Sequence, residues 1–180
     1  KMLFTGHIED YILGKQLGKG SYAVVKEGFH KINSIKVAIK IYDRYSFYDS
    51  NNRGAVRQEI DVMKQLKHEN IVRFYESIFF QQHIYLIMEL VTGISLFDYL
   101  KQQKDQKIEE AECKNIFIQI VRAVNHCHIK NISHRDIKLE NIILTENNTK
   151  VKLIDFGLSV VLNSTETGEQ ACGSLVYIAP

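Results

Sequence analysis

The chain has 180 residues, of which 45% are hydrophobic and 24% are charged. This is the composition of a globular domain with a sizeable apolar core, and it argues against an intrinsically disordered chain. The formal net charge of +2 gives no support to nucleic acid or an anionic membrane surface as a partner.

Short strand-like runs dominate the first half of the chain. They cover residues 11–18, 22–29, 36–42, 76–80 and 84–90, with a turn-like segment at 81–83. These runs predict a mostly antiparallel sheet. One interruption is helical, because apolar side chains over residues 53–67 recur at the spacing of one helix face. That face consists of Val56, Ile60, Met63 and Leu66.

After Leu90 the pattern becomes mainly helical. The clearest helix is predicted over residues 109–130, with an apolar stripe formed by Cys113, Phe117, Ile120, Val121, Val124 and Cys127. The only proline is Pro180, so no proline-rich linker divides the strand-rich part from the helix-rich part. We therefore expect an α+β fold.

Residues 17–25, LGKGSYAVV, form a glycine-rich turn between two of the predicted strands. A dinucleotide-binding motif would need a helix directly after the turn, and a strand follows instead. Gly18 and Gly20 lack a Cβ atom, so backbone N–H groups could approach phosphate oxygens closely. On these residues alone, a plain β-hairpin turn and a phosphate-binding loop are both open.

The strand over residues 36–42 carries the sequence Val37-Ala38-Ile39-Lys40. A lysine in an apolar strand is costly to bury unless an anion pairs with it. The predicted helix over residues 53–67 offers Glu59, beside its apolar face. A purely structural ion pair between Lys40 and Glu59 is as good an interpretation of these two residues as a functional one.

Two further motifs decide between these interpretations. Residues 133–141 read SHRDIKLEN, and after a short predicted strand residues 151–157 read VKLIDFG. With the glycine-rich turn and VAIK, the chain resembles the eukaryotic protein kinases, in which H-R-D-x-K-x-x-N, D-F-G, V-A-I-K and a glycine-rich loop occur in this order. The resemblance runs from Tyr11 to Pro180, where Ala179-Pro180 is similar to the start of the family's A-P-E motif.

The resemblance implies a two-lobed fold. We expect an N-terminal extension at residues 1–10, an N-lobe at 11–90 with an antiparallel sheet and one main helix, and the start of a mainly helical C-lobe at 91–180. The chain stops inside the A-P-E motif, so the resemblance also implies that this kinase domain (11–180) is partial and its C-lobe incomplete.

The chemistry of phosphoryl transfer fits the motif residues. The phosphates must be held, their charge neutralised by Mg²⁺, and an acceptor hydroxyl placed in line. Asp155, at a strand end before Gly157, which allows a sharp turn, and Asn141 are oxygen ligands suited to Mg²⁺. Asp136 is left to act as the general base, and Lys138 can steady the transferred group as a point charge.

The remaining roles follow from the resemblance. Lys40 holds the α and β phosphates of ATP and is held by Glu59. Met88 precedes a hinge, residues 89–91, whose backbone reads the adenine edge. The full set of nucleotide contacts implied in this way is Leu17, Gly18, Lys19, Gly20, Ser21, Tyr22, Ala23, Val25, Ala38, Lys40, Glu89, Val91 and Ile143.

The resemblance also bears on substrate and regulation. The run DIKLEN implies a protein Ser/Thr substrate rather than Tyr, and CGSLVY (172–177) is similar to the calcium/calmodulin-dependent kinase group, especially its AMP-activated and microtubule-affinity-regulating branches. Gln170 stands at the group's usual phosphorylation site. Either the loop takes its ordered form without a phosphate, or an upstream kinase phosphorylates Ser164, Thr165 or Thr167 instead, and we favour the second alternative because three hydroxyl groups cluster there.

The three cysteines are odd in number and lack C-x-x-C spacing, which indicates neither a disulfide framework nor a zinc site. With no signal-peptide pattern at the start, we expect a cytoplasmic or nuclear protein without nucleic-acid or membrane partners. Two functions remain: an ATP- and Mg²⁺-dependent protein Ser/Thr kinase, and a pseudokinase or truncated module that binds nucleotide or a partner without turnover.

Overall fold

The computed structural model describes residues 3–20, 23–43, 50–162, 173, 174, 176 and 177. It divides into two compact units. Unit 1 comprises Lys1–Ile60 and Arg73–Leu90, and unit 2 comprises Asp61–Val72 and Val91–Pro180. None of the helices in the described ranges is both long and apolar enough to span a lipid bilayer.

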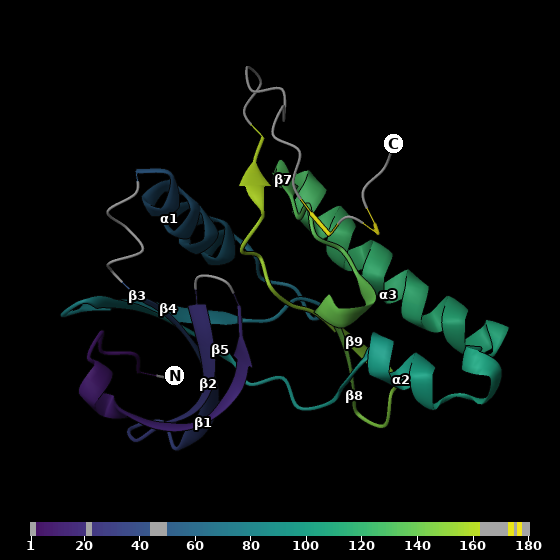
Figure 1. Ribbon diagram of the computed structural model, residues 1–180, viewed down its shortest axis with the longest axis horizontal. Coiled ribbons are helices and arrows are strands. Elements are labelled where there is room, and N and C mark those ends of the chain that lie inside the picture. Colours follow the sequence, from purple (N-terminus) through teal and green to yellow (C-terminus); the bar gives the residue numbers. More distant parts are fainter. Residues whose placement is uncertain (1–2, 21–22, 44–49, 163–172, 175, 178–180) are drawn as a thin grey trace. The chain divides into compact units, whose positions relative to one another are not determined.

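Unit 1 is built on a five-stranded antiparallel sheet with the order β1-β2-β3-β5-β4 (Figure 1). The strands are β1 (Tyr11–Lys19), β2 (Ala23–His30), β3 (Ile35–Asp43), β4 (Phe74–Phe80) and β5 (His83–Glu89), and the helix α1 covers Ser50–Gln65. The sequence prediction of an antiparallel sheet interrupted by one helix is confirmed. The helix begins three residues earlier than its apolar pattern indicated.

The two faces of this sheet carry separate apolar clusters. Because β-strand side chains alternate, β3 contributes Ile39 to one cluster and Tyr42 to the other. The cluster on the α1 side contains Tyr42, Val56, Ile60, Ile84 and Leu86. The opposite cluster contains Tyr11, Val37, Ile39, Ile78 and Ile87. Val56 and Ile60 are one helical turn apart on α1, so their burial fixes which face of the helix meets the sheet.

The segment before β1 also packs on unit 1. The ring of Phe4 stacks on Tyr75 with 4.9 Å between the ring centroids. Asn33 exchanges hydrogen bonds with the backbone of Leu3, and the short 3-10 helix η1 (Ile8–Asp10) leads into β1.

Unit 2 combines two α-helices with short strands. The helices are α2 (Leu96–Gln102) and α3 (Glu110–Ile129), with 3-10 turns η3 (Lys104–Gln106) and η4 (Leu139–Asn141). The strands are β6 (Ile94–Ser95), β7 (Ile132–Ser133), β8 (Ile142–Thr145), β9 (Lys150–Leu153) and β10 (Val160–Val161). They form a β6-β8-β9 sheet and a β10-β7 pair. Ser95 caps α2, because its hydroxyl oxygen accepts a hydrogen bond from the Asp98 backbone N–H.

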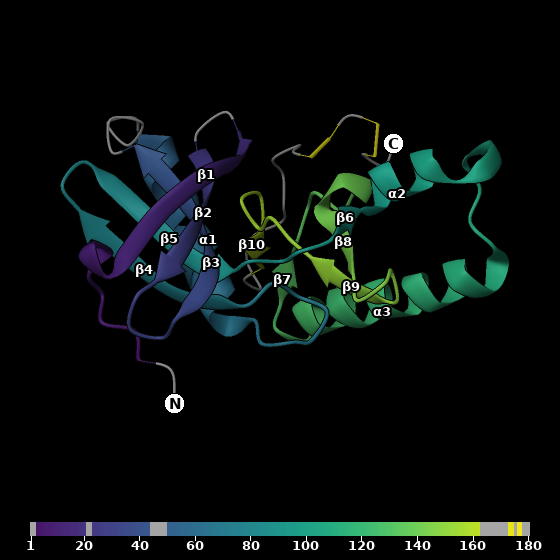
Figure 2. The same ribbon diagram turned by 90° about the horizontal axis from the view of Figure 1, so that it is seen from below.

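The helix α3 packs against β7 and β9 (Figure 2). Ile116, Ala123 and Cys127 are its buried side chains, whereas Phe117 and Val121 of the predicted stripe are 62% and 47% exposed. The helix prediction is confirmed, but the stripe is only partly the buried face. The strands contact a narrower part of the helix than the full run of apolar residues.

A short segment after α1 is fastened to the rest of unit 2 through Asn70. The buried Asn70 side chain donates from Nδ2 to the Gln119 side chain and to the Val151 carbonyl, at 2.9 Å in each case. The backbone carbonyl of Asn70 accepts from the Leu153 N–H at 2.8 Å, and the Val72 N–H donates to the Leu153 carbonyl at 2.9 Å. Residues 70–72 thereby act as an extra parallel neighbour of β9.

We predict that Asn70→Ala destabilises the protein, because the buried Val151 carbonyl and the Gln119 amide lose a partner. The expected cost is about 1–3 kcal/mol, measured as a lower urea midpoint. Asn125→Ala on the exposed side of α3 is the matched control and should leave the midpoint unchanged. Equal midpoints for the two variants would show that the Asn70 contacts contribute nothing.

Candidate active site

Lys40 and Glu59 form a buried ion pair in unit 1. The distance from Lys40 Nζ to Glu59 Oε1 is 2.7 Å, and the two side chains are 13% and 3% exposed. Lys40 lies on β3 and Glu59 on α1, three residues after Val56, which helps to anchor the helix on the sheet. The pair anticipated from the sequence is therefore present.

The glycine-rich turn joins β1 to β2. Gly18 is the strand neighbour of Val25, and Val25 is the strand neighbour of Lys40. Directly paired residues of antiparallel strands share a face, so the turn, Val25 and Lys40 form one row across the sheet. The Gly20 N–H donates to the Ala23 carbonyl at 2.8 Å and closes the turn. The predicted contacts Ser21 and Tyr22 lie outside the described residues.

The residues assigned to adenine lie on several elements. Ala38 is paired with Met88 on β5, and Val37 with Glu89. The Glu89 N–H donates to the Arg73 carbonyl at 2.8 Å. Leu17 and Lys19 are exposed on β1, and Ala23 is half-buried at the start of β2. In unit 2, Val91 is half-buried and Ile143 lies on β8.

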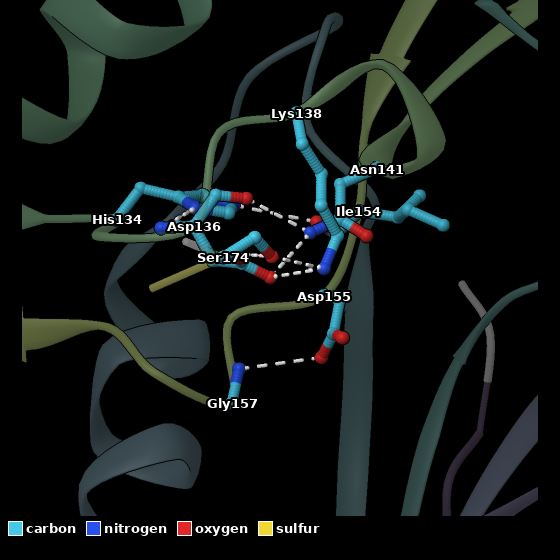
Figure 3. Close-up of polar contacts among 8 residues, drawn as sticks. All are labelled: His134, Asp136, Lys138, Asn141, Ile154, Asp155, Gly157 and Ser174. Atoms are coloured by element: carbon cyan, nitrogen blue, oxygen red, sulfur yellow. Dashed lines mark hydrogen bonds and ion pairs between the residues drawn. The ribbon is translucent and has the colours of Figure 1, made fainter. Parts of the chain in front are cut away.

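Asp136 is the centre of a polar cluster in unit 2 (Figure 3). Its carboxylate is 8% exposed. Lys138 Nζ lies 2.8 Å from its Oδ2, Asn141 Nδ2 donates to the same oxygen at 3.0 Å, and the Ser174 hydroxyl donates to Oδ1 at 2.8 Å. Lys138 also donates to Ser174 Oγ at 2.9 Å. The structure thus brings together Asp136, Lys138 and Asn141, as the sequence predicted.

Ser174 is a member of this cluster that the sequence analysis did not identify. It lies 38 residues after Asp136, in CGSLVY, which the sequence analysis used only to compare families. A single serine forms no recognisable sequence motif with the catalytic residues. Only its place directly after Gly173, which has φ of 119°, hints at a specific backbone conformation.

The cluster controls the charge of Asp136. Burial raises the pKa of its carboxyl group, but the hydrogen bonds from Lys138, Ser174 and Asn141 and the positive charge of Lys138 outweigh burial and lower that pKa below its usual range. The hydrogen bond to Asp136 raises the pKa of Lys138. At neutral pH the two side chains are therefore a carboxylate and an ammonium ion, and the carboxylate can accept a proton.

Asn141 and Asp155 are tied together through the backbone of Ile154. The Ile154 N–H donates to the Asn141 carbonyl at 2.9 Å, and His134 Nε2 donates to the Ile154 carbonyl at 3.3 Å. His134 Nδ1 accepts from the Asp136 N–H, and burial lowers the pKa of this imidazole, which keeps it neutral. The strand end that leads to Asp155 is thus bound to the loop that carries Asp136.

After β9 the chain changes direction at Asp155 and turns again at Gly157. Asp155 has a left-handed φ of 59°, and its Oδ1 accepts from the Gly157 N–H at 3.3 Å. Aspartate tolerates this conformation better than most residues, since its short side chain bonds the local backbone. The Ser159 N–H donates to the Phe156 carbonyl at 3.0 Å and closes a turn over Gly157 and Leu158, so the turn predicted at Gly157 is also present.

The donor set fits a magnesium ion. Asp155 is exposed, and because Asn141 donates through Nδ2, its Oδ1 is the atom left to act as a ligand. The described residues contain no group of three or more His, Cys, Asp or Glu side chains placed to bind a metal. Two protein oxygens suit Mg²⁺, which keeps several waters and takes further oxygens from phosphates, and do not suit a closed zinc site.

Comparison with known proteins identifies one family. The family model described as "protein kinase domain" matches residues 11–180. The chain is 41% identical over 170 residues to an SNF-related serine/threonine-protein kinase of Homo sapiens, which covers 94% of this chain. In Arabidopsis thaliana, it is 39% identical over 173 residues (96% of this chain) to SNF1-related protein kinase catalytic subunit alpha KIN12.

A third relative is CBL-interacting serine/threonine-protein kinase 21 of Arabidopsis thaliana, 38% identical over 176 residues, or 98% of this chain. The chain spans 22% of the human relative's length and 34% and 41% of the two plant relatives. The likeness therefore concerns one region of each relative.

We predict that Ser174→Ala raises the pKa of Asp136, because the carboxylate loses one of its hydrogen-bond donors. The titration of the Asp136 carboxyl carbon, followed by ¹³C NMR, should move to higher pH. Ser77→Ala on β4 is the control and should leave the curve in place. A curve for Ser174→Ala that coincides with that of the parent would contradict the role given to the Ser174 hydroxyl.

Proposed function

Because the chain belongs to the protein kinase family, we propose that the protein is an ATP-dependent protein Ser/Thr kinase that transfers the γ-phosphoryl group to a protein hydroxyl. The observation that supports this most strongly is the cluster in which Asp136 is buried, ionised and in contact with Lys138 and Asn141. Such a carboxylate is suited to accept the proton of an attacking hydroxyl.

Each residue of the cluster has a task in this proposal. Asp136 orients the acceptor hydroxyl and takes its proton as the hydroxyl oxygen bonds to the γ-phosphorus and the bond from that phosphorus to the bridging oxygen of ADP breaks. Lys138 places a positive charge beside the transferred group, where negative charge is spread over the phosphoryl oxygens. Asn141 and Asp155 would hold Mg²⁺, which supplies charge neutralisation on the phosphates.

Unit 1 supplies the second set of groups. Lys40 would contact the α and β phosphates of ATP, held in place by Glu59. The glycine-rich turn would present backbone N–H groups to the phosphates, and Val25 and Ala38 would pack on the adenine ring. ATP and Mg²⁺ are the cofactors that the family uses, and these residues are the ones we assign to them here.

Serine and threonine are the proposed acceptors. The support is Lys138, two residues after Asp136 in the run DIKLEN, together with relatives whose names describe serine/threonine-protein kinases. No observation in the described residues favours a pseudokinase, since Lys40, Asp136, Asn141 and Asp155 are all present.

Regulation by an upstream kinase stays a prediction. Ser164, Thr165, Thr167 and Gln170 lie outside the described residues. We also propose a cytoplasmic or nuclear location, and a protein without nucleic-acid or membrane partners, as expected from the sequence.

We predict that Asp136→Asn abolishes most of the phosphoryl transfer. Asparagine keeps the size of the side chain but is a far weaker base, so kcat should fall about 10²–10⁴-fold while ATP affinity changes little. The assay follows phosphate from γ-labelled Mg·ATP into a Ser/Thr peptide, with full-length protein. Asp61→Asn, exposed on α1, is the control. A parental rate for Asp136→Asn would overturn the proposal.

A further inference from the structure

Tyr42 places a hydroxyl group at the Lys40–Glu59 ion pair. Along β3, side chains two residues apart lie on the same face of the sheet. Tyr42 therefore lies on the same face as Lys40 and next to it along the strand. The Tyr42 hydroxyl donates to Glu59 Oε2, and Lys40 Nζ lies 5.4 Å from the centroid of the Tyr42 ring.

The Glu59 carboxylate therefore has a separate partner for each oxygen. Oε1 accepts from the Lys40 ammonium at 2.7 Å, and Oε2 accepts from the Tyr42 hydroxyl. Glu59 is only 2% exposed, so water is a poor substitute for either partner. A carboxylate bound at both ends cannot rotate freely about its terminal torsion, and its Oε1 stays directed at Lys40.

Packing fixes the tyrosine itself. Tyr42 is 6% exposed and belongs to the cluster with Val56, Ile60, Ile84 and Leu86. Its ring is thus held by the two α1 residues that flank Glu59 and by two residues of β5. Burial raises the pKa of the phenol above its ordinary value, Glu59 adds to the rise, and the charge of Lys40 and its hydrogen bond to the phenol oxygen oppose it. The hydroxyl therefore stays a donor at neutral pH.

We propose that Tyr42 is a positioning residue for phosphoryl transfer, which holds the Glu59 carboxylate so that the Lys40 ammonium is fixed at the place where it meets the nucleotide phosphates. The proposal rests on the proposed kinase function. It assigns no contact between Tyr42 and the nucleotide, since the tyrosine acts through Glu59.

The effect follows from the loss of the Tyr42 hydroxyl group. In Tyr42→Phe the ring still fills the cluster, but Glu59 Oε2 loses its donor and the carboxylate can turn toward Lys40 with both oxygens. Lys40 is then drawn away from its position. A buried hydrogen bond to a charged group corresponds to about a tenfold effect or more on an equilibrium constant, so KM for ATP should rise about tenfold.

The test compares Tyr42→Phe with Tyr85→Phe in the full-length protein. Tyr85 is half-buried on β5 of the same sheet, and its hydroxyl has no hydrogen-bond partner among the described residues. For Tyr42→Phe we expect a higher KM for ATP and an unchanged KM for the peptide, whereas Tyr85→Phe should keep both. A merely structural role would lower the unfolding temperature and the active fraction without changing KM for ATP.

A double-mutant cycle tests the route through Glu59. In a Glu59→Gln background Lys40 has already lost its charged partner, so adding Tyr42→Phe should change the affinity for a non-hydrolysable Mg·ATP analogue less than twofold. Effects that multiply fully would overturn the proposal, as would an unchanged KM for ATP in Tyr42→Phe. An inactive parent protein would instead refute the proposed function, and the binding cycle would still test the role of Tyr42.

Discussion

The arrangement of unit 2 depends on the stabilisation of one buried carboxylate. An ionised Asp136 that is 8% exposed would be expensive without partners. Its donors come from three places along the chain: Lys138 two residues on, Asn141 at the end of η4, and Ser174 far downstream. Each must be held by its own local structure for the carboxylate to stay charged. The left-handed backbone of Arg135, with φ of 63°, is a local strain that such a network can maintain.

Backbone hydrogen bonds connect the parts of unit 2 that carry these residues. Residues 70–72 bond to β9, β9 ends at Leu153, and Ile154 is bonded to both Asn141 and His134. The loop with Asp136 and the strand end with Asp155 are therefore joined by one set of hydrogen bonds. In unit 1, the Glu59 carboxylate is likewise held by hydrogen bonds to both of its oxygens. Preorganised charge of this kind is what phosphoryl transfer requires from a protein.

Much of this could be predicted from the sequence, because the decisive groups stand within short motifs. Strand alternation, the helical spacing from Val56 to Leu66 and the runs SHRDIKLEN and VKLIDFG are local patterns. Ser174 and Tyr42 could not be predicted, since their partners lie 38 and 17 residues away, and a serine or a tyrosine is an ordinary residue until its neighbour in space is known. The left-handed backbone of Asp155 was not predicted for a related reason: glycine is the default for φ above zero, and only the structure shows the Asp155 side chain stabilising that conformation.

The central claim is that Asn141 and Asp155 are placed to hold Mg²⁺ beside the phosphates of ATP, with Asp136 free to receive the hydroxyl proton. A crystal structure of the full-length protein with Mg²⁺ and a non-hydrolysable ATP analogue tests this most directly. The account predicts the metal ion bound by Asn141 Oδ1 and the Asp155 carboxylate, at the 2.0–2.1 Å typical of magnesium, and Asp136 without a metal contact. A metal ion held by other side chains, or Asp136 as a metal ligand, would contradict it.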